Sequence, residues 1–367
     1  MDPIGGAKSV PWTLEDADRY CERLAQTHYE NFTVGSWLLP KSQRRQVYAV
    51  YAYCRTVDDL GDEDTATWEG APGEHPAGGG LVQNRTLVEV AGTPPPGAKS
   101  APGGQRRPVG SQEKSRRLAL LDWWEGELRC CYSGTPAHPV MVALQRTISD
   151  FDIPARPFLK LIEANRMDQR ADRYSTYSEL LNYCDHSANP VGHLFLYLFG
   201  YRDEQRQRLA DATCTALQLS NFWQDVARDY SQGRVYLPEE DMQRFGYTEE
   251  ELASGLASQE FRRLLAFQVD RARALFREGA PLVETLEGAG KLDVALFTRG
   301  GVAILDAIEG RNYDVLSARP ALSRTRKAAL FASTWLAWKL GSKLGLNLLP
   351  KIKCPRDPRG PATGGPQ

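Results

Sequence analysis

The sequence has no long apolar run, no paired-cysteine motif and no excess of charge of one sign. No stretch of about 18 apolar residues occurs, so no membrane-spanning helix is expected. The seven cysteines show no CxxC spacing, which argues against a zinc site or a disulfide framework and fits a reducing compartment. The 45 basic and 46 acidic side chains nearly balance, so the positive field of a nucleic-acid binder is absent.

Two recognition signatures are also missing. The first residues, MDPIGGAKSVPW, lack a charged segment followed by an apolar one, so no secretory signal is expected and a cytoplasmic location is predicted. The glycine cluster Gly288-Ala289-Gly290-Lys291 has neither the GxGxxG form nor a strand before it. We therefore expect no nicotinamide site and no NADPH.

Helical periodicity is present from Thr13 onward, where apolar residues recur at three- and four-residue spacings. This pattern predicts an all-α bundle. Pro40 is expected to open the helix PKSQRRQVYAVYAYCRTVDDLGDE, because proline is tolerated in a first turn. Other helix starts are marked by pairs typical of a capping box, namely Thr13 with Asp16, Thr176 with Glu179 and Thr248 with Glu251.

Two segments carry too little apolar surface to fold. Residues 66–111 and the tail 354–367 are rich in glycine and proline, so we expect an inserted loop and a disordered end. The loop follows the first acidic motif, where it either covers the site or is a passive insertion. The rest, 12–350, is predicted to be one domain large enough to enclose an apolar pocket.

The first acidic motif lies on the helix that Pro40 opens. Val47, Tyr51, Cys54, Asp58 and Asp62 share one face, which changes along its length from apolar to acidic. Carboxylates four residues apart on a helix are separated by about 6 Å along its axis. They can hold Mg²⁺ beside a phosphate group. An acidic helix end that simply faces water is the alternative interpretation.

The second motif is a polar stripe in the helix LQLSNFWQDVARD. Gln218, Asn221, Asp225 and Asp229 follow spacings of three, four and four, and large apolar residues flank them. A buried polar face costs free energy unless it meets a ligand. A structural hydrogen-bond network is the alternative. Two DxxxD helices in a chain without a Walker motif predict a magnesium-bound diphosphate held by Asp58, Asp62, Asp225 and Asp229.

Over residues 13–64 and 112–320 the chain resembles the squalene/phytoene synthase family. The resemblance rests on HYENFTVGSWLLPKSQRRQVYAVYAYCRTVDDLGD, MDQRADRYSTYSELLNYC and LQLSNFWQDVARDYSQGRVYLPEEDM. It implies a single-domain, all-α trans-isoprenoid synthase fold with a central cavity between the two DxxxD helices. It also implies an isoprenoid diphosphate substrate and Mg²⁺ as cofactor. Matched by position, the site residues beside the four aspartates are Tyr51, Arg55, Gln218 and Asn221.

Several departures indicate one branch of the family. Residues 183–192 read YCDHSANPVG where squalene and phytoene synthases usually read YCYxVAGxVG, and Gln224 stands where many members have arginine. The combination ENF, SANPVG and LQLSNFWQDV looks like the bacterial hydroxysqualene synthases. Those enzymes convert presqualene diphosphate to hydroxysqualene in hopanoid-making bacteria, usually beside a separate presqualene-forming synthase and a reductase. We expect the same reaction here.

That reaction needs a shielded cation and a positioned water molecule. Aromatic rings such as Phe32, Trp37, Tyr51, Phe222 or Trp223 are candidates to stabilise the cation, unless they only pack the core. His186 is a candidate to position or deprotonate the water; a polar core residue is the alternative.

Two other functions compete with this prediction. One is head-to-head condensation of two farnesyl or geranylgeranyl diphosphates to presqualene diphosphate, squalene or phytoene. The other is a non-catalytic membrane scaffold for pathway partners. The segment 320–353 is basic and contains tryptophan, so it predicts either peripheral contact with the inner membrane or a helix that closes the bundle. The sequence leaves the chain length of the substrate and the oligomeric state open.

Overall fold

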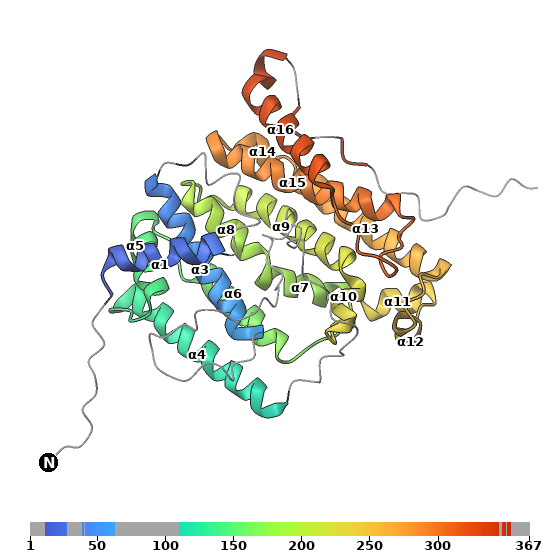
Figure 1. Ribbon diagram of the computed structural model, residues 1–367, viewed down its shortest axis with the longest axis horizontal. Helices are drawn as coiled ribbons and strands as arrows, with labels where there is room; N and C mark the ends of the chain where they lie inside the picture. The colour runs from blue at the N-terminus through green and yellow to red at the C-terminus, as the bar shows by residue number, and fades with distance from the viewer. Residues whose placement is uncertain are drawn as a thin grey trace, which may run out of the picture. The chain divides into compact units, whose positions relative to one another are not determined.

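The computed structural model describes residues 12–27, 39, 41–62, 110–344, 347–349 and 351–353 (Figure 1). Every regular element in those ranges is an α-helix and none is a strand, which confirms the all-helical prediction. The helices belong to two compact units, the first ending at Gln169 and the second beginning at Arg170. No helix in the described ranges is long and apolar enough to cross a membrane.

The first unit is built around helix α3 (Lys41–Asp62), which packs against four other helices. These are α1 (Leu14–Thr27), α4 (Ser111–Ser133), α5 (Pro139–Phe151) and α6 (Arg156–Asp168). The centre of the unit is aromatic: the buried Tyr53 ring stacks on Trp124 with centroids 5.7 Å apart. The Tyr53 hydroxyl donates a hydrogen bond of 2.9 Å to the Phe158 carbonyl. These contacts hold α3 between α4 and α6.

The second unit is built around α9 (Glu204–Gln224), which packs against α7, α8, α13 and α15 (Figure 1). In chain order the helices around it are α7 (Tyr177–Ser187), α8 (Asn189–Leu198), α10 (Val226–Ser231), α11 (Glu239–Phe245), α12 (Glu249–Ala253), α13 (Gln259–Gly279), α14 (Leu282–Thr285), α15 (Gly288–Gly310) and α16 (Arg324–Leu344). Since neighbours cover α9 on several sides, nearly all its side chains from Ala210 onward are buried, the polar ones included.

Small residues let two of these helices approach α9 closely. A Cβ atom at Gly279 of α13 would lie 2.9 Å from both the Leu209 carbonyl oxygen and the Thr213 nitrogen. A Cβ atom at Gly192 of α8 would lie 2.6 Å from the Cys214 sulfur. Any larger residue at these crossings would push a helix away. The close crossings fix the position of the polar stripe on α9.

The helix starts expected from capping pairs are confirmed. The Thr248 hydroxyl accepts from the Glu251 N–H at 3.3 Å, and the Glu251 carboxylate accepts from the Thr248 N–H at 2.8 Å, which completes a capping box. At the start of α1 the Thr13 hydroxyl accepts from the Asp16 N–H, and at the start of α7 the Thr176 hydroxyl accepts from the Glu179 N–H. The helix expected after proline begins at Lys41, and Pro40 itself lies outside the described residues.

One boundary of the expected insertion differs in the structure. Helix α4 begins at Ser111 with Gly110 as its N-cap, so the predicted loop 66–111 extends two residues too far. The remainder of that loop, 66–109, and the tail 354–367 lie outside the described residues. Their disorder and the single domain over 12–350 stay predictions.

Candidate functional site

The first acidic motif lies at the end of α3. Tyr51, Cys54 and Asp58 are all buried, as their shared face predicts, and the Asp58 residue is only 8 % exposed. The Asn165 amide of α6 donates a hydrogen bond of 3.3 Å to the Asp58 carboxylate. Burial raises the pKa of the Tyr51 phenol to about 12, so this ring keeps its proton at neutral pH. Asp62 ends the helix, and its side chain is outside the described part of the structure.

The last turn of α3 is held by its neighbours through Gly61. The Gly61 carbonyl accepts from the Arg117 guanidinium at 3.0 Å and from the Gln169 amide at 2.9 Å. A Cβ atom at residue 61 would lie 2.1 Å from the Asn165 side-chain oxygen, so only glycine allows this approach. The Asn165 side chain therefore contacts both Gly61 and the Asp58 carboxylate, and this packing fixes the position of the first acidic motif.

Arg55 has an acidic partner on its own helix. Its guanidinium makes two hydrogen bonds to the Asp59 carboxylate, at 2.6 and 3.1 Å, and both side chains are nearly buried. Burial alone would lower the pKa of Arg55, but the charge of Asp59 and the bonds to it raise that pKa overall. The guanidinium therefore remains charged, and a diphosphate would compete with Asp59 for it.

The second acidic motif is a buried polar face, as predicted. Gln218, Asn221, Asp225 and Asp229 are each at most 3 % exposed. The single helix expected to carry them is interrupted, however, because α9 ends at Gln224 and α10 begins at Val226. Asp225 lies between the two helices with φ −112° and ψ 14°. This correction is small, since the Asp229 N–H still donates to the Asp225 carbonyl at 2.9 Å and the face continues across the break.

Two buried donors on this stretch have no acceptor among the residues that the structure describes. They are the side-chain amide nitrogen of Asn221 and the indole nitrogen of Trp223, and both are fully shielded from solvent. Buried polar groups in native proteins are nearly always satisfied. An anionic ligand or its ordered water would supply the missing acceptors.

Arg319 is a candidate site residue that no sequence motif indicated. Its guanidinium binds the fully buried Asp225 carboxylate through two nitrogens, one of them at 3.1 Å from the carboxylate oxygen. The arginine itself is 34 % exposed, so it reaches from solvent to a buried acid. No local pattern could have revealed the pair, because 94 residues separate its members.

Gln224 holds the backbone next to this arginine. Its buried side-chain amide donates a hydrogen bond of 2.5 Å to the carbonyl of Pro320, the residue after Arg319. The end of α9 thus binds the 319–320 segment twice, once through Asp225 and once through Gln224. The glutamine that replaces a family arginine therefore has a positioning contact of its own.

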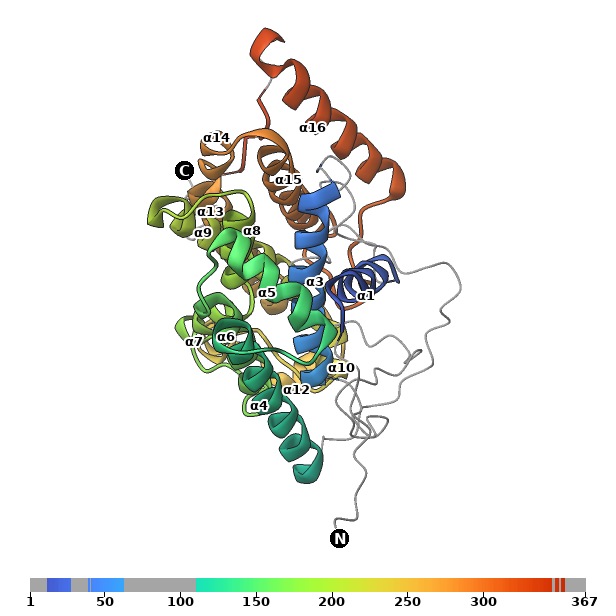
Figure 2. The same cartoon turned by 90° about the vertical axis from the view of Figure 1, so that its left-hand side faces the viewer.

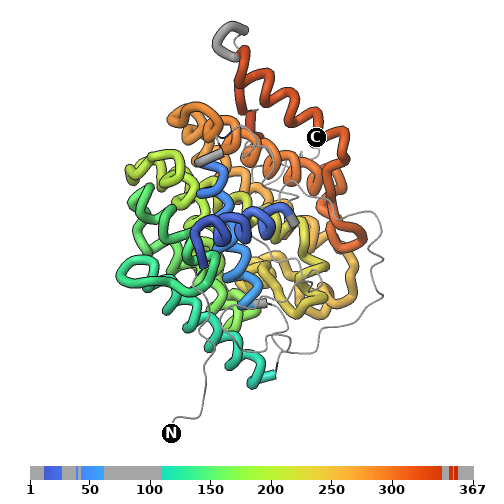
Figure 3. Tube along the Cα trace, turned by 60° about the vertical axis from the view of Figure 1, so that its left-hand side comes forward, coloured from blue at the N-terminus to red at the C-terminus, as the bar shows by residue number. Residues whose placement is uncertain are grey.

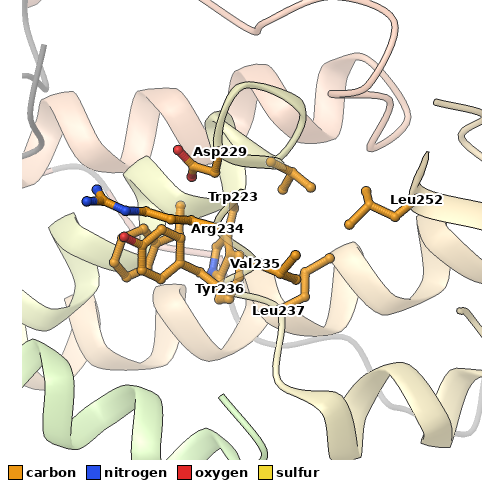
Figure 4. Close-up of a pocket in the computed structure, with 9 residues that line it drawn as sticks. Trp223, Asp229, Arg234, Val235, Tyr236, Leu237 and Leu252 are labelled. Carbon is orange, nitrogen blue, oxygen red and sulfur yellow. The ribbon is translucent and has the colours of Figure 1, made fainter. Parts of the chain in front are cut away.

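Asp229 opens onto a recess in the second unit (Figure 4). The recess is small, with enclosed room for about one water molecule. Its polar and apolar parts are separate: Figure 4 shows Asp229 and Arg234 on one side, and Val235, Leu237 and Leu252 on the other. The remaining lining residues are Phe222, Trp223, Val226 and Tyr236.

Aromatic rings form one wall of this recess. Phe222 and Tyr236 stack with centroids 3.8 Å apart, and Tyr183 of α7 lies 6.0 Å from Tyr236. Of the rings proposed to shield a cation, Phe222 and Trp223 therefore line a hollow beside an acid. Tyr51 is a buried residue of the first unit, and Phe32 and Trp37 lie outside the described residues.

The ring of His186 is oriented by a backbone carbonyl of its own helix. Its Nδ1 lies 2.8 Å from the Asn182 carbonyl oxygen, one turn earlier in α7. A carbonyl only accepts, so Nδ1 carries the hydrogen and Nε2 is the nitrogen that can take a proton. The side chain is 23 % exposed, and His186 is not among the described residues that line the recess.

Each acidic motif suits a cation that it shares with a bound ligand better than a cation held by protein side chains alone. Among the residues that the structure describes, no three His, Cys, Asp or Glu side chains gather into a metal site. Mg²⁺ usually binds one or two carboxylates together with substrate phosphates. Buried aspartates at each motif, with Arg55 and Arg319 beside them, therefore fit magnesium that arrives with a phosphate ligand.

Comparisons with known proteins agree with this geometry. The family model described as squalene/phytoene synthase matches residues 25–326. The crystal structure of squalene synthase HpnC from Alicyclobacillus acidocaldarius is 40 % identical, with a TM-score of 0.66 over 83 % of this chain and 98 % of that one. A dehydrosqualene synthase in complex with a ligand, 23 % identical, shares the fold with a TM-score of 0.67 over 90 % of this chain and 98 % of that one.

Curated sequences give the same result. The 15-cis-phytoene synthase of Synechocystis sp. is 28 % identical over 338 residues, which cover 88 % of this chain and 86 % of the relative. Phytoene synthase of Arthrospira platensis is also 28 % identical, over 87 % of this chain and 92 % of that one. The all-helical fold, the two aspartate motifs and these matches lead to one conclusion: the chain belongs to the squalene/phytoene synthase family.

Proposed function

We propose that this protein converts presqualene diphosphate to hydroxysqualene and releases diphosphate in a magnesium-dependent reaction. The observation that carries the proposal is the buried polar face of Gln218, Asn221, Asp225 and Asp229 on α9 and α10. The similarity to a squalene synthase supports a thirty-carbon substrate. The SANPVG and NFWQD segments support water rather than hydride as the final reactant.

The aspartates and arginines have complementary tasks in this reaction. Asp58, Asp62, Asp225 and Asp229 hold the metal-bound diphosphate, and bound Mg²⁺ supplies positive charge that neutralises the departing group. Arg319 contributes its own positive charge beside Asp225. Both carboxylate and guanidinium are fixed by contacts already present in the protein, so little reorganisation is needed when the ligand binds.

The remaining site residues orient the ligand and hold it away from water. Tyr51, Arg55, Gln218 and Asn221 line the diphosphate end, where the buried Asn221 amide donates to a phosphate oxygen. Arg55 binds the diphosphate with its charged guanidinium, for which the diphosphate competes with the Asp59 carboxylate.

The carbon skeleton needs a dry environment once the carbon–oxygen bond to diphosphate breaks. The electron pair leaves with the diphosphate oxygen, and the cyclopropylcarbinyl cation that remains opens its ring while aromatic faces such as Phe222 and Tyr236 shield it. Water then forms the new carbon–oxygen bond and loses one proton. His186 Nε2 is the base proposed for that proton, because Nδ1 already donates to the Asn182 carbonyl.

The decisive experiment supplies presqualene diphosphate and Mg²⁺ to the purified protein without NADPH. The extracted lipid is analysed by mass spectrometry after reaction in water labelled with heavy oxygen. Hydroxysqualene that carries the label is the expected product. Chelation of the metal is the control, and it should stop diphosphate release.

A condensing synthase is the competing function, and the phytoene synthase relatives favour it. The same protein is therefore incubated with farnesyl or geranylgeranyl diphosphate alone. Consumption of either one, with presqualene diphosphate untouched, would replace the proposed reaction by head-to-head condensation. No Mg²⁺-dependent release of diphosphate from any of the three would support the non-catalytic scaffold.

Gln224→Met is expected to weaken substrate binding, because it removes the bond that holds Pro320 and so loosens Arg319. The KM for presqualene diphosphate should rise about tenfold, since misplaced contacting groups are costly. The free energy of unfolding should fall by about 1–2 kcal/mol, because the buried Pro320 carbonyl loses its hydrogen-bond donor.

The matched control for Gln224→Met is Gln145→Met in the first unit, where the amide also donates to a backbone carbonyl, that of Gly134 at 3.0 Å. It should lower stability without changing KM. Steady-state kinetics and thermal melting on both variants separate the two effects. An unchanged KM in Gln224→Met would remove the positioning role.

A further inference from the structure

One side of helix α16 packs against the other helices of the second unit, and we call it the inner side. Thr334 and Ala337 are buried, and Ala337 belongs to an apolar cluster with Leu282 and Val294. Arg299 of α15 donates to the Ser333 hydroxyl of α16 at 2.9 Å. Helix α16 therefore packs on its neighbours through Thr334, Ala337 and the partly buried Trp338.

The outer side of α16 carries large apolar side chains that are exposed in the described part of the chain. Phe331, Trp335 and Leu336 are 39 %, 40 % and 44 % exposed, and they are half of the six exposed large apolar residues in the described part of the chain. Phe331 and Trp335 are one helical turn apart, and Leu336 follows Trp335 directly. Figures 2 and 3 show α16 at the margin of the second unit, with α15 along one of its sides. We call Phe331, Trp335 and Leu336 the α16 patch.

Positive charge flanks the α16 patch at both ends. Arg324 and Arg326 are exposed before it, and the exposed Lys339 follows Trp335 by one helical turn. The whole segment 320–353 contains seven basic residues and no acidic one. A surface with an apolar centre and only positive charge around it is complementary to an anionic bilayer.

From this surface we infer that α16 binds the surface of an anionic lipid bilayer, lying in the plane of the interface. Trp335 and Phe331 insert at the level of the lipid headgroups, where aromatic rings partition favourably. Arg324 and Lys339 contact the lipid phosphates. A second copy of the chain fits this surface poorly, because two α16 patches that face each other bring like charges together without an acidic partner. The inference does not depend on which isoprenoid diphosphate the enzyme uses.

The test is flotation of the full-length protein with vesicles of phosphatidylcholine alone or mixed with an equal amount of phosphatidylglycerol. We expect binding to the anionic vesicles at low salt and release at high salt. The variant F331S/W335S/L336S should bind at least about tenfold more weakly, because it removes the apolar area that would be buried. The matched control is Leu256→Ser, which replaces an exposed leucine elsewhere in the second unit, 68 % exposed, and should bind normally.

A second variant tests the charge contribution without altering the α16 patch. R324E/K339E should weaken binding to anionic vesicles by at least about tenfold, because each basic residue near such a surface contributes separately. Both substitutions lie on exposed positions, so thermal melting should show a folded protein. R208E, at an exposed arginine of α9, is the charge control and should bind normally.

Three results would overturn the inference. The first is no binding of the unmodified protein to anionic vesicles. The second is binding that both variants retain. The third is a concentration-dependent dimer in sedimentation experiments that F331S/W335S/L336S abolishes, which would assign the α16 patch to a second copy of the chain.

Discussion

Replacing Asp225 with asparagine is expected to lower kcat by about a thousandfold, comparable to the loss of a key electrostatic group in other enzymes. Asparagine has nearly the same shape, but it cannot bind Mg²⁺ as a carboxylate does, nor balance the charge of Arg319. Because Arg319 is partly exposed, water can replace the lost partner, and the fold should melt at nearly the same temperature. Diphosphate release and thermal melting are the measurements.

The control for Asp225→Asn is Asp211→Asn in α9, the helix that ends just before Asp225. The Asp211 carboxylate is partly exposed and lies 2.7 Å from Nε2 of His193, so its loss removes a carboxylate but no predicted metal ligand. We expect near-normal turnover from this variant. An Asp225→Asn protein that retains most of its activity would contradict the proposed magnesium-binding role of the second acidic motif.

The stability advantage of Asp293→Asn over the unmodified protein is expected to grow as the pH rises from 3.8 to about 7. Asp293 lies on α15, is 7 % exposed, and burial raises the pKa of its carboxyl from 3.8 to about 7. Below 3.8 the carboxyl is neutral in both states, and the fold carries no penalty. Between 3.8 and about 7 the folded protein keeps a proton that the unfolded chain has lost, so its stability falls as pH increases.

The stability of Asp293→Asn relative to the unmodified protein should therefore change by a few kcal/mol across this pH range, since each unit of pKa shift corresponds to about 1.4 kcal/mol. Chemical denaturation at several pH values measures the difference. Any constant cost of the new amide cancels, because only the slope with pH is predicted. A difference that does not depend on pH would contradict the prediction.

Asp314→Asn is a control with the opposite sign. Burial alone would raise the pKa of the Asp314 carboxyl, but the Ser317 N–H at 3.0 Å and the Arg262 guanidinium at 3.3 Å lower it overall. This carboxylate stabilises the fold above its unfolded pKa, and that stability is lost as pH falls. Asp314→Asn should therefore destabilise the protein at neutral pH and have little effect in acid.

Local features of the fold could be predicted from the sequence because their causes lie within a few residues. The caps at Thr176 and Thr248 depend on partners three residues away. The polar face through Gln218 and Asp229 follows from helical spacing, and burial of that face follows from its apolar flanks. The break at Asp225 was missed, because spacing alone does not show a change of two backbone angles.

A contact between two residues of the proposed site could be predicted only where both residues belong to one sequence motif. The aspartate motifs were found from their spacing. Arg319 beside Asp225, the Gln224 bond to Pro320 and the Asn165 bond to Asp58 join segments roughly a hundred residues apart, and no sequence pattern relates their members. The pairing of Arg55 with Asp59 was within reach, because the two residues are four apart on one helix.

The order of residues along the chain predicts the helical class, the caps, the two acidic faces and the basic, tryptophan-containing character of α16. These properties depend on side-chain chemistry repeated along one helix, which spacing records directly. Three-dimensional packing is needed to show which charges neutralise the acids and which side of α16 is exposed in the described part of the chain. Such choices depend on where distant helices cross, as at Gly61 and Gly279, and a crossing is set by the packing of the whole unit.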